Sequence, residues 1–173
     1  AILGYSVAAA IIFTYVGFSS EYAVAGYGSA TRIEQVVLLP ILGINTAIIS
    51  IIAQNIGAKQ HNRVEKSYFT SVRYGLCLMI IAGIIIYLTA EIVPKFFSSN
   101  TDVIAYGTMY LKISAFILPA YPIFFLSNGF FMALKKSEKA MLNNIIRNVI
   151  VPILSFYIAR HINADFKTFF YIW

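Results

Sequence analysis

The residues able to do chemistry are few, and the most informative is Glu34. It lies in the mostly apolar stretch RIEQVVLLPILG, which begins at Arg32 and ends at Gly43. A carboxylate among apolar groups is expensive to keep charged, so it needs a proton, a bound cation or a basic partner. Arg32 is a poor partner within a helix, because side chains two residues apart point to nearly opposite sides. Glu34 is therefore a candidate site for a proton, a sodium ion or a cationic ligand.

Several other polar side chains interrupt apolar runs of the chain. Together with Glu34, they give the candidate cation- or drug-binding residues Glu34, Asn45, Asn128 and Arg147. Two plainer roles stay open for Glu34: a buried structural ion pair, for example with Arg147, or a position in a wet vestibule. The asparagines have a plainer role as well, because amide side chains commonly hydrogen-bond between membrane helices.

Two of these candidate residues, Glu34 and Asn45, are expected on the same helix face. In a helix, Glu34, Ile41, Asn45 and Ile52 follow one another at intervals of seven, four and seven residues, which places them roughly in line. We expect this face to be a candidate cavity wall.

Enzyme chemistry finds little support in the sequence. A membrane enzyme needs paired acids, bases or nucleophiles at depth, and Glu34 is the one deep carboxylate. There is no phosphate loop, nucleophile elbow or zinc-ligand spacing, and Cys77 is the single cysteine. We therefore expect a protein that is not an enzyme and that uses no metal and no cofactor.

Composition identifies the surroundings of these residues as a membrane. The 173 residues are 60% hydrophobic, 16% aromatic and only 12% charged, which is too apolar for a water-soluble domain of this size. Crossing about 30 Å of hydrocarbon takes about 20 apolar residues in a helix. The sequence therefore predicts an all-α integral membrane fold with spans at about 1–20, 22–55, 68–93, 104–134 and 138–160, and the start of another at 166–173. Both ends fall inside apolar segments, so we expect a fragment of a longer protein.

The depth of Glu34 follows from these spans. If the second helix begins near Tyr22, a rise of ~1.5 Å per residue places Glu34 about 18 Å from the outer end of that helix. This depth lies well inside the bilayer.

Basic residues predict the orientation. The links at 57–73 and 135–147 each contain four Lys or Arg residues, and two helices separate them, so they lie on the same side. By the positive-inside rule, both links are cytoplasmic. The net charge of +6 is then explained by topology and by contact with membrane lipid, and we expect no nucleic-acid partner.

Prolines and a glycine interrupt the predicted spans. Pro40 and Gly43 lie in the second span, and Pro119 and Pro122 in the fourth. Proline removes a backbone donor and clashes with the preceding turn, so we expect hinges at these positions. Transporters use such interrupted helices beside a central cavity, although proline is also frequent in membrane helices generally.

The run from Ala25 to Ala47, followed by Gln54-Asn-Ile-Gly-Ala-Lys59 and Arg63, resembles the second half of a multidrug and toxic compound extrusion (MATE) transporter. In that family, a helix with a mid-span Pro and Gly ends at a cytoplasmic Gln-Asn-x-Gly-Ala-Lys element. The matching residues of that element are Gln54, Asn55, Gly57 and Ala58. The resemblance covers essentially the whole chain.

This resemblance implies a twelve-helix transporter made of two six-helix bundles. The chain would be most of the C-terminal six-helix bundle, and its partner would be the missing N-terminal bundle of the same protein. The implied activity is multidrug efflux by antiport, in which a small cationic or amphipathic compound leaves in exchange for protons or sodium. The implied location is the bacterial inner membrane.

Two other readings of the sequence remain. A flippase for polysaccharides or lipid-linked precursors shares the architecture of this superfamily, but it fits the Ala25 to Arg63 signature less closely. A channel or scaffold belongs to a different class, and kinked helices with scattered polar groups argue against the continuous polar ring of a pore.

Overall fold

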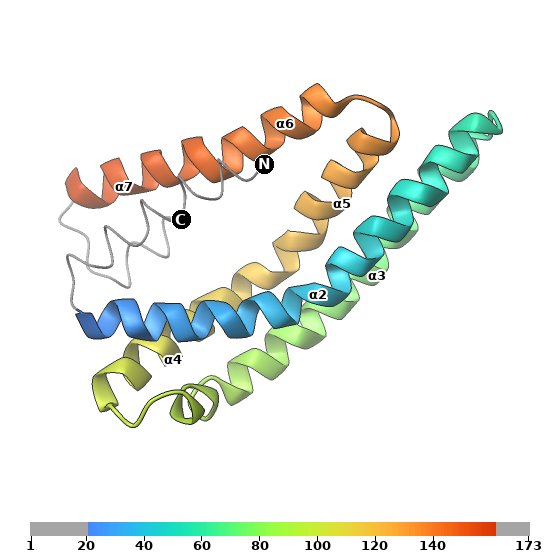
Figure 1. The fold of residues 1–173 in the computed structure, drawn as a ribbon. Helices are drawn as coiled ribbons and strands as arrows, with labels where there is room; N and C mark the ends of the chain where they lie inside the picture. Colours follow the sequence, from blue (N-terminus) through green and yellow to red (C-terminus); the bar gives the residue numbers. More distant parts are fainter. Residues whose placement is uncertain (1–20, 162–173) are drawn as a thin grey trace. The chain divides into compact units, whose positions relative to one another are not determined.

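The computed structural model describes residues 21–161, and every element within that range is helical (Figure 1). Four short non-helical connections, at 58–60, 90–92, 97–100 and 134–136, join the helices of this range. The helical structure agrees with the prediction from the apolar composition. The elements are α2 (Glu21–Gly57), α3 (His61–Thr89), the 3₁₀ helix η1 (Val93–Phe96), α4 (Thr101–Ile117), the 3₁₀ helix η2 (Leu118–Ala120), α5 (Tyr121–Ala133), α6 (Ser137–Ile145), the π-helix η3 (Ile146–Ile150) and α7 (Val151–His161).

Three of the described helical stretches are long and apolar enough to cross a membrane. They are Glu21–Gly57, Thr101–Ala133 and His61–Thr89. The last one begins seven residues before the expected span at 68, because the basic segment that follows the turn is helical too. The predicted all-helical fold is confirmed. The predicted span at 138–160 is not among these three stretches, because it is divided into α6, η3 and α7. The six-helix bundle stays a prediction, since its spans at 1–20 and 166–173 lie outside the described residues.

The chain divides into two compact units. Among the described residues, unit 1 contains 21–34, 86–114 and 144–161, and unit 2 contains 35–85 and 115–143. The division falls inside α2, α3, α4 and α6, so each of these helices contributes residues to both units.

Small residues bring α2 and α4 together in unit 1. A Cβ on Gly26 would lie 2.7 Å from the carbonyl oxygen of Val103 and 2.8 Å from Cβ of Tyr106. Ala23 and Ala30, which lie near Gly26 on the same helix face, are fully buried. In lipid, such close backbone approach replaces the hydrophobic effect as a source of helix association.

The start of α4 is fixed by a side-chain cap. The Asn100 side-chain oxygen accepts hydrogen bonds from the backbone N–H groups of Asp102, at 2.9 Å, and Val103, at 3.4 Å. These bonds satisfy amides that have no partner within the helix. Asp102 also places a negative charge in the first turn, where the helix dipole favours it.

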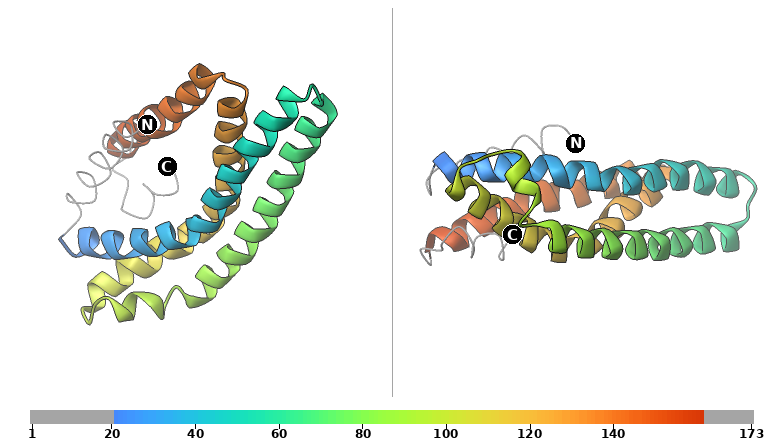
Figure 2. Two further views of the ribbon diagram at one scale, coloured as in Figure 1. Left: turned by 45° about the vertical axis from the view of Figure 1, so that its right-hand side comes forward. Right: turned by 90° about the horizontal axis from the view of Figure 1, so that it is seen from below.

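Unit 2 is assembled around two glycines of α3. A Cβ on Gly75 would lie 2.9 Å from Cδ1 of Ile41 and 3.0 Å from Cβ of Pro122, and a Cβ on Gly83 would lie 2.6 Å from the carbonyl oxygen of Ala115. The parts of α2 and α3 in this unit run side by side in both views of Figure 2. These contacts make α3 the helix against which α2, α4 and α5 pack.

The prolines affect the helices unequally. Pro119 lies in the 3₁₀ turn Leu118–Ala120, which interrupts the fourth predicted span, and Pro122 is the second residue of α5. Pro40, by contrast, lies inside the continuous helix α2. The sequence did not predict the π-helix at Ile146–Ile150, which precedes Pro152. Pro152 has no amide hydrogen, so it cannot donate the usual helical hydrogen bond to the preceding turn. The irregular backbone before it is a consequence of this missing bond.

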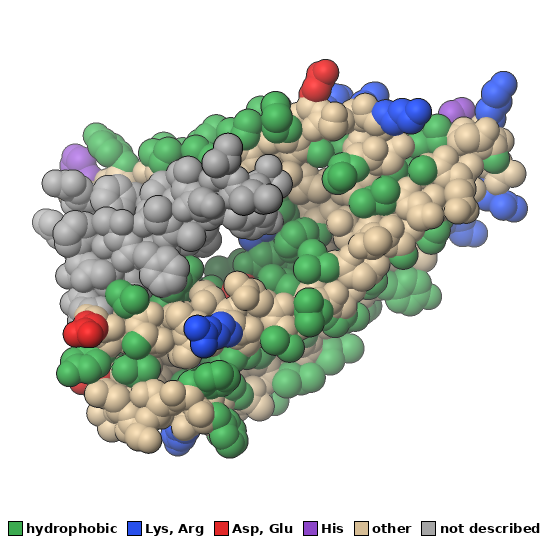
Figure 3. Space-filling model, viewed as in Figure 1, with side chains coloured by type: hydrophobic (Ala, Val, Ile, Leu, Met, Phe, Trp, Pro, Cys, Tyr) green, Lys and Arg blue, Asp and Glu red, His purple; other side chains and the backbone are tan. Residues whose placement is uncertain are grey.

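Two turns in unit 2 have the same backbone design. Lys59 and Lys135 adopt left-handed conformations, with φ of 58° and 57°. In each turn, the lysine N–H bonds to a carbonyl three residues earlier, at Ile56 or Met132, and the next N–H bonds five residues back. This is the Schellman arrangement, which usually has glycine in place of the lysine. Lys and Arg side chains gather over the α2–α3 turn (Figure 3).

Large apolar side chains are exposed along the outside of α3. Ile81, Ile84, Ile85 and Leu88 are between 55% and 71% exposed. A water-soluble protein would bury such a stripe, whereas a membrane helix presents it to lipid. The chain is an integral membrane protein.

Candidate functional site

Glu34 is buried in unit 1 and is hydrogen-bonded. It is 7% exposed, and its Oε2 accepts a hydrogen bond of 2.5 Å from the hydroxyl of Tyr110 on α4. Tyr27 lies one heptad earlier on α2 and packs its ring edge-on against Tyr110, with the ring centroids 5.0 Å apart. The packing of Tyr27 against Tyr110 therefore holds the Tyr110 hydroxyl in position to donate to the carboxylate.

The local sequence explains why Glu34 points inwards. Ala23, Tyr27 and Ala30 share its helix face and are all buried, and this face packs against α4 in unit 1. Arg32 is exposed, as expected for a side chain two residues from a buried one. The prediction that these two charges diverge is confirmed.

The face that continues from Glu34 along α2 is packed rather than open. Ile41, Ile48 and Ile52 are at most 1% exposed, and Ile41 lies against Gly75. The expectation that Ile41 and Ile52 would line a cavity is therefore wrong for unit 2, because apolar packing occupies this face. The exposed side of this part of α2 carries Gln35, Pro40, Gly43, Ser50 and Gln54.

Asn45 and Asn128 both lie in unit 2, in tightly packed surroundings. The buried Oδ1 of Asn45 has no hydrogen-bond partner and lies 2.2 Å from the position that a Cβ on Gly129 would take. Asn128 is 8% exposed and accepts a hydrogen bond of 3.2 Å from Nδ2 of Asn143 on α6. This bond matches the interhelical role that amides commonly have in membranes.

Arg147 lies in unit 1, in the π-helix η3, and is half-buried. The next residue, Asn148, is 6% exposed, and its buried Nδ2 has no hydrogen-bond partner. π-helical turns often occur at functional sites because they reorient side chains. The ion pair of Glu34 with Arg147 stays a prediction, although both residues belong to the same unit.

The residues of the family motif are at the surface of unit 2. Gln54 and Asn55 bond within their own helix, Gln54 to the hydroxyl of Ser50 at 3.4 Å and Asn55 to the carbonyl of Ile51 at 2.8 Å. Gly57 has open space around it, and Ala58 leads into the Schellman turn at Lys59. In the described structure, this motif ends a helix.

Sequence reasoning missed the two tyrosines at Glu34. Tyr27 was identifiable, because it precedes Glu34 by seven residues on the same helix face. Tyr110 carries no such signal, since it comes from a helix 76 residues away in sequence. No group of three His, Cys, Asp or Glu residues between 21 and 161 is arranged to hold a metal ion.

Comparison with known proteins bears on the family and the fold of the chain. The MatE family model matches residues 1–158. A Bacillus subtilis (strain 168) relative named "Probable multidrug resistance protein YpnP" is 28% identical over 162 residues, which are 94% of this chain and 34% of the relative. A Shewanella oneidensis relative named "FAD transporter" is 26% identical over 104 residues, 60% of this chain and 23% of that protein. The chain therefore spans about a third or less of the length of these curated relatives.

A solved structure shares the fold. It is described as the outward-facing conformation of a multidrug resistance MATE family transporter of the MOP superfamily. The TM-score is 0.92 at 22% identity, over 98% of this chain and 38% of that one. Members of the MATE family are transporters rather than enzymes. Because the family model covers nearly all of the sequence, from Ala1 to Ile158, the chain belongs to the MatE family.

Proposed function

We propose that the full protein exports small cationic or amphipathic compounds in exchange for protons or sodium ions, and that Glu34 carries the exchanged ion. The observation that carries this proposal is the burial of Glu34 in a membrane helix, with the Tyr110 hydroxyl donating to the carboxylate. A carboxylate within a membrane helix is costly, so its presence there supports a functional role.

The exchange follows from the chemistry of one carboxylate. A proton, a sodium ion and a cationic substrate all neutralise the same negative charge, so binding of one opposes binding of another. Tyr110 holds the carboxylate in place and donates to it while it is charged. Alternating access then converts this competition into transport, because the site releases the ion on one side and the substrate on the other.

The proposed substrate class rests on the negative charge of Glu34 and on the name of a relative. A buried carboxylate favours cationic substrates, and the B. subtilis relative carries multidrug resistance in its name. The S. oneidensis relative is named for FAD, an anionic compound, so FAD is the informative competitor. No observation among the described residues favours the flippase alternative.

The orientation is part of the same proposal. Unit 2 contains both Schellman turns, together with the first seven of the basic residues at 57–73 and 135–147. We place both turns in the cytoplasm of a bacterial cell, by the positive-inside rule. The missing N-terminal bundle would complete the transporter.

Transport by the full-length protein in vesicles tests this proposal. Efflux of an ethidium-like cation is measured under a proton gradient alone and under a sodium gradient alone, with and without excess FAD. We expect one gradient to drive efflux and FAD to compete weakly. Efflux that neither gradient drives would overturn the antiport, and strong competition by FAD would overturn the cationic substrate class.

A further inference from the structure

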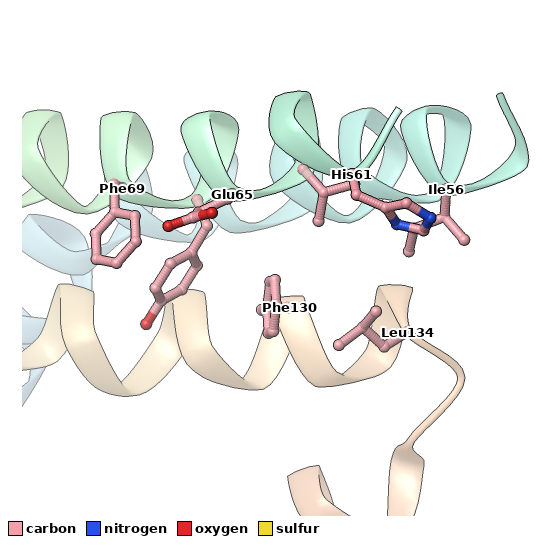
Figure 4. A pocket seen from close by; sticks show the side chains of 8 residues that line it. Ile56, His61, Glu65, Phe69, Phe130 and Leu134 are labelled. Carbon is pink, nitrogen blue, oxygen red and sulfur yellow. The ribbon is translucent and has the colours of Figure 1, made fainter. Parts of the chain in front are cut away.

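A pocket separate from Glu34 lies in unit 2, between α2, α3 and α5. Its volume is about 390 Å³, which lies within the range of small-molecule sites. Figure 4 shows side chains from α3 facing side chains from α5 across it, with α2 contributing from behind. The labelled residues are Ile56, His61, Glu65, Phe69, Phe130 and Leu134.

Aromatic packing holds the walls of this pocket in place. The Tyr68 ring lies 4.9 Å from the Phe130 ring and 5.4 Å from the Phe69 ring, measured between centroids. The Tyr68 hydroxyl and the Ser127 hydroxyl are hydrogen-bonded at 2.8 Å, which ties α3 to α5. The polar end of Tyr68 is thereby satisfied, and its ring leaves an apolar surface facing the pocket.

Both basic turns adjoin the pocket. Lys135 directly follows the lining residue Leu134, and Lys59 lies between the lining residues Ile56 and His61. Residues 57–73 and 135–143 together contain seven Lys or Arg side chains and two Glu side chains. This excess of positive charge opposes a cationic occupant, even though Glu65 lines the pocket, and favours an amphipathic anion.

We propose that this pocket binds one acyl chain of an anionic phospholipid, and that Lys59 and Lys135 hold its phosphate group. The pocket accepts the chain through apolar and aromatic contacts, and the two turns supply the charge complementarity. Basic pockets between membrane helices bind anionic lipid headgroups in this manner. The left-handed backbone of each turn sets the direction in which its lysine leaves the helix end.

Fluorescence quenching in the full-length protein tests the acyl chain. Tryptophan is introduced by Phe130→Trp inside the pocket and, as a matched control, by Phe116→Trp at a side chain that is 75% exposed. Each protein is reconstituted with brominated phosphatidylglycerol or brominated phosphatidylcholine, and the signal of the parent protein is subtracted. We expect phosphatidylglycerol to quench Phe130→Trp about twofold more strongly than phosphatidylcholine, and both lipids to quench Phe116→Trp equally.

Charge removal tests the headgroup contact. Adding Lys59→Gln and Lys135→Gln to the Phe130→Trp protein is expected to abolish the preference for phosphatidylglycerol, whereas adding Lys95→Gln, an exchange in unit 1, leaves it intact. Equal quenching of Phe130→Trp by the two lipids overturns the proposal. So does displacement of bound lipid by tetraphenylphosphonium at micromolar concentration, because that result would make the pocket a cation site.

Discussion

The buried face of helix α2 carries a charged residue in unit 1 and apolar residues in unit 2. In unit 1 this face carries Glu34, which meets the Tyr110 hydroxyl, and in unit 2 it carries Ile41, Ile48 and Ile52, which are packed almost without exposure. Burial alone therefore does not identify a site in a membrane protein. A buried carboxylate with a polar donor is a better candidate for a site, because an ionisable side chain within a membrane helix is costly and commonly marks the path of a substrate or an ion.

The largest expected effect comes from removing the charge in unit 1. Glu34→Gln keeps the shape and a hydrogen-bonding group but cannot bind a proton or a sodium ion in exchange for a cation. We expect ion-driven efflux to fall roughly a hundredfold, which is ~2.7 kcal/mol, with unchanged expression. The matched control is Glu21→Gln, an exposed glutamate on the same helix. Efflux that survives Glu34→Gln at the control level would assign Glu34 a structural role.

The next largest effect is a loss of stability, expected when the glycines at the close helix contacts of each unit are replaced. Gly26→Ala and Gly83→Ala would drive a methyl group into the carbonyl oxygens of Val103 and Ala115. We expect each to lower the free energy of unfolding by about 1–3 kcal/mol, which is the usual cost of overpacking. Thermal unfolding of the purified full-length protein measures this loss.

Other glycines provide controls on the same helix. Gly28 and Gly43 of α2 have no atom within 4 Å of an added Cβ, so Gly28→Ala and Gly43→Ala should leave stability unchanged or slightly raised. If Gly26→Ala unfolds no earlier than Gly28→Ala, the close packing of α2 on α4 is not needed for stability.

A smaller effect is expected at the donor to Glu34. Tyr110→Phe keeps the ring that packs on Tyr27 but removes the hydroxyl that donates to the carboxylate. A hydrogen bond to a charged group contributes about 1.5–3 kcal/mol, so we expect efflux to slow by at least roughly tenfold. Tyr106→Phe on the same helix is the control. Equal efflux by the two variants would remove Tyr110 from the site.

Unit 2 should gain stability at its two turns. Lys59→Gly and Lys135→Gly relieve the strain of a side chain at positive φ, and we expect each to stabilise the protein by about 1 kcal/mol. Lys66→Gly, inside α3, should instead destabilise it by a similar amount. Thermal unfolding in detergent without added lipid tests both signs. Stabilisation by Lys66→Gly as well would show that charge removal, and not backbone relief, is responsible.

The smallest effect lies at the surface of unit 1. Lys112 donates a hydrogen bond of 2.6 Å to Glu91, the second residue after the end of α3. This hydrogen bond and the ammonium charge lower the pKa of the Glu91 carboxyl. The contribution of the pair is therefore complete above the ordinary carboxyl pKa and is lost as the pH falls through the lowered value.

The pH dependence of unfolding tests this pair. We expect the full-length protein to unfold slightly later than its Glu91→Gln variant at neutral pH, and the difference to vanish in acid. Since both side chains are exposed, the difference should also shrink with added salt. A difference that persists in acid would have another cause.

The sequence predicts the helices well because their signal is local. Apolar runs identify the helices of residues 21–161, and the spacing of Arg32 and Glu34 correctly places them on opposite sides. Pro119 marks the 3₁₀ turn in the fourth span. In each case, the deciding interactions lie within a few residues of one another.

Long-range contacts explain what the sequence leaves out. Tyr110 and Glu34 meet through the packing of two helices, which requires Gly26 to approach the backbone of α4. The helix face at Ile41 and Ile52 fits a cavity wall and a packed core equally well. The spacing of residues along the sequence identifies this face, but it does not show whether the face borders a cavity or packs against other helices. Pro152 accounts for irregular backbone before it, but residue types do not show that this irregularity takes the form of a π-helix at Arg147.

Ion release on substrate binding tests the central claim most directly. The purified full-length protein is placed in weakly buffered detergent solution, a cationic substrate is added, and the released protons or sodium ions are counted per bound substrate. We predict that the wild-type protein releases about one ion per substrate, as expected for exchange at one carboxylate, and that Glu34→Gln releases none. Equal release by the wild-type protein and Glu34→Gln would contradict the assignment of the exchanged ion to Glu34.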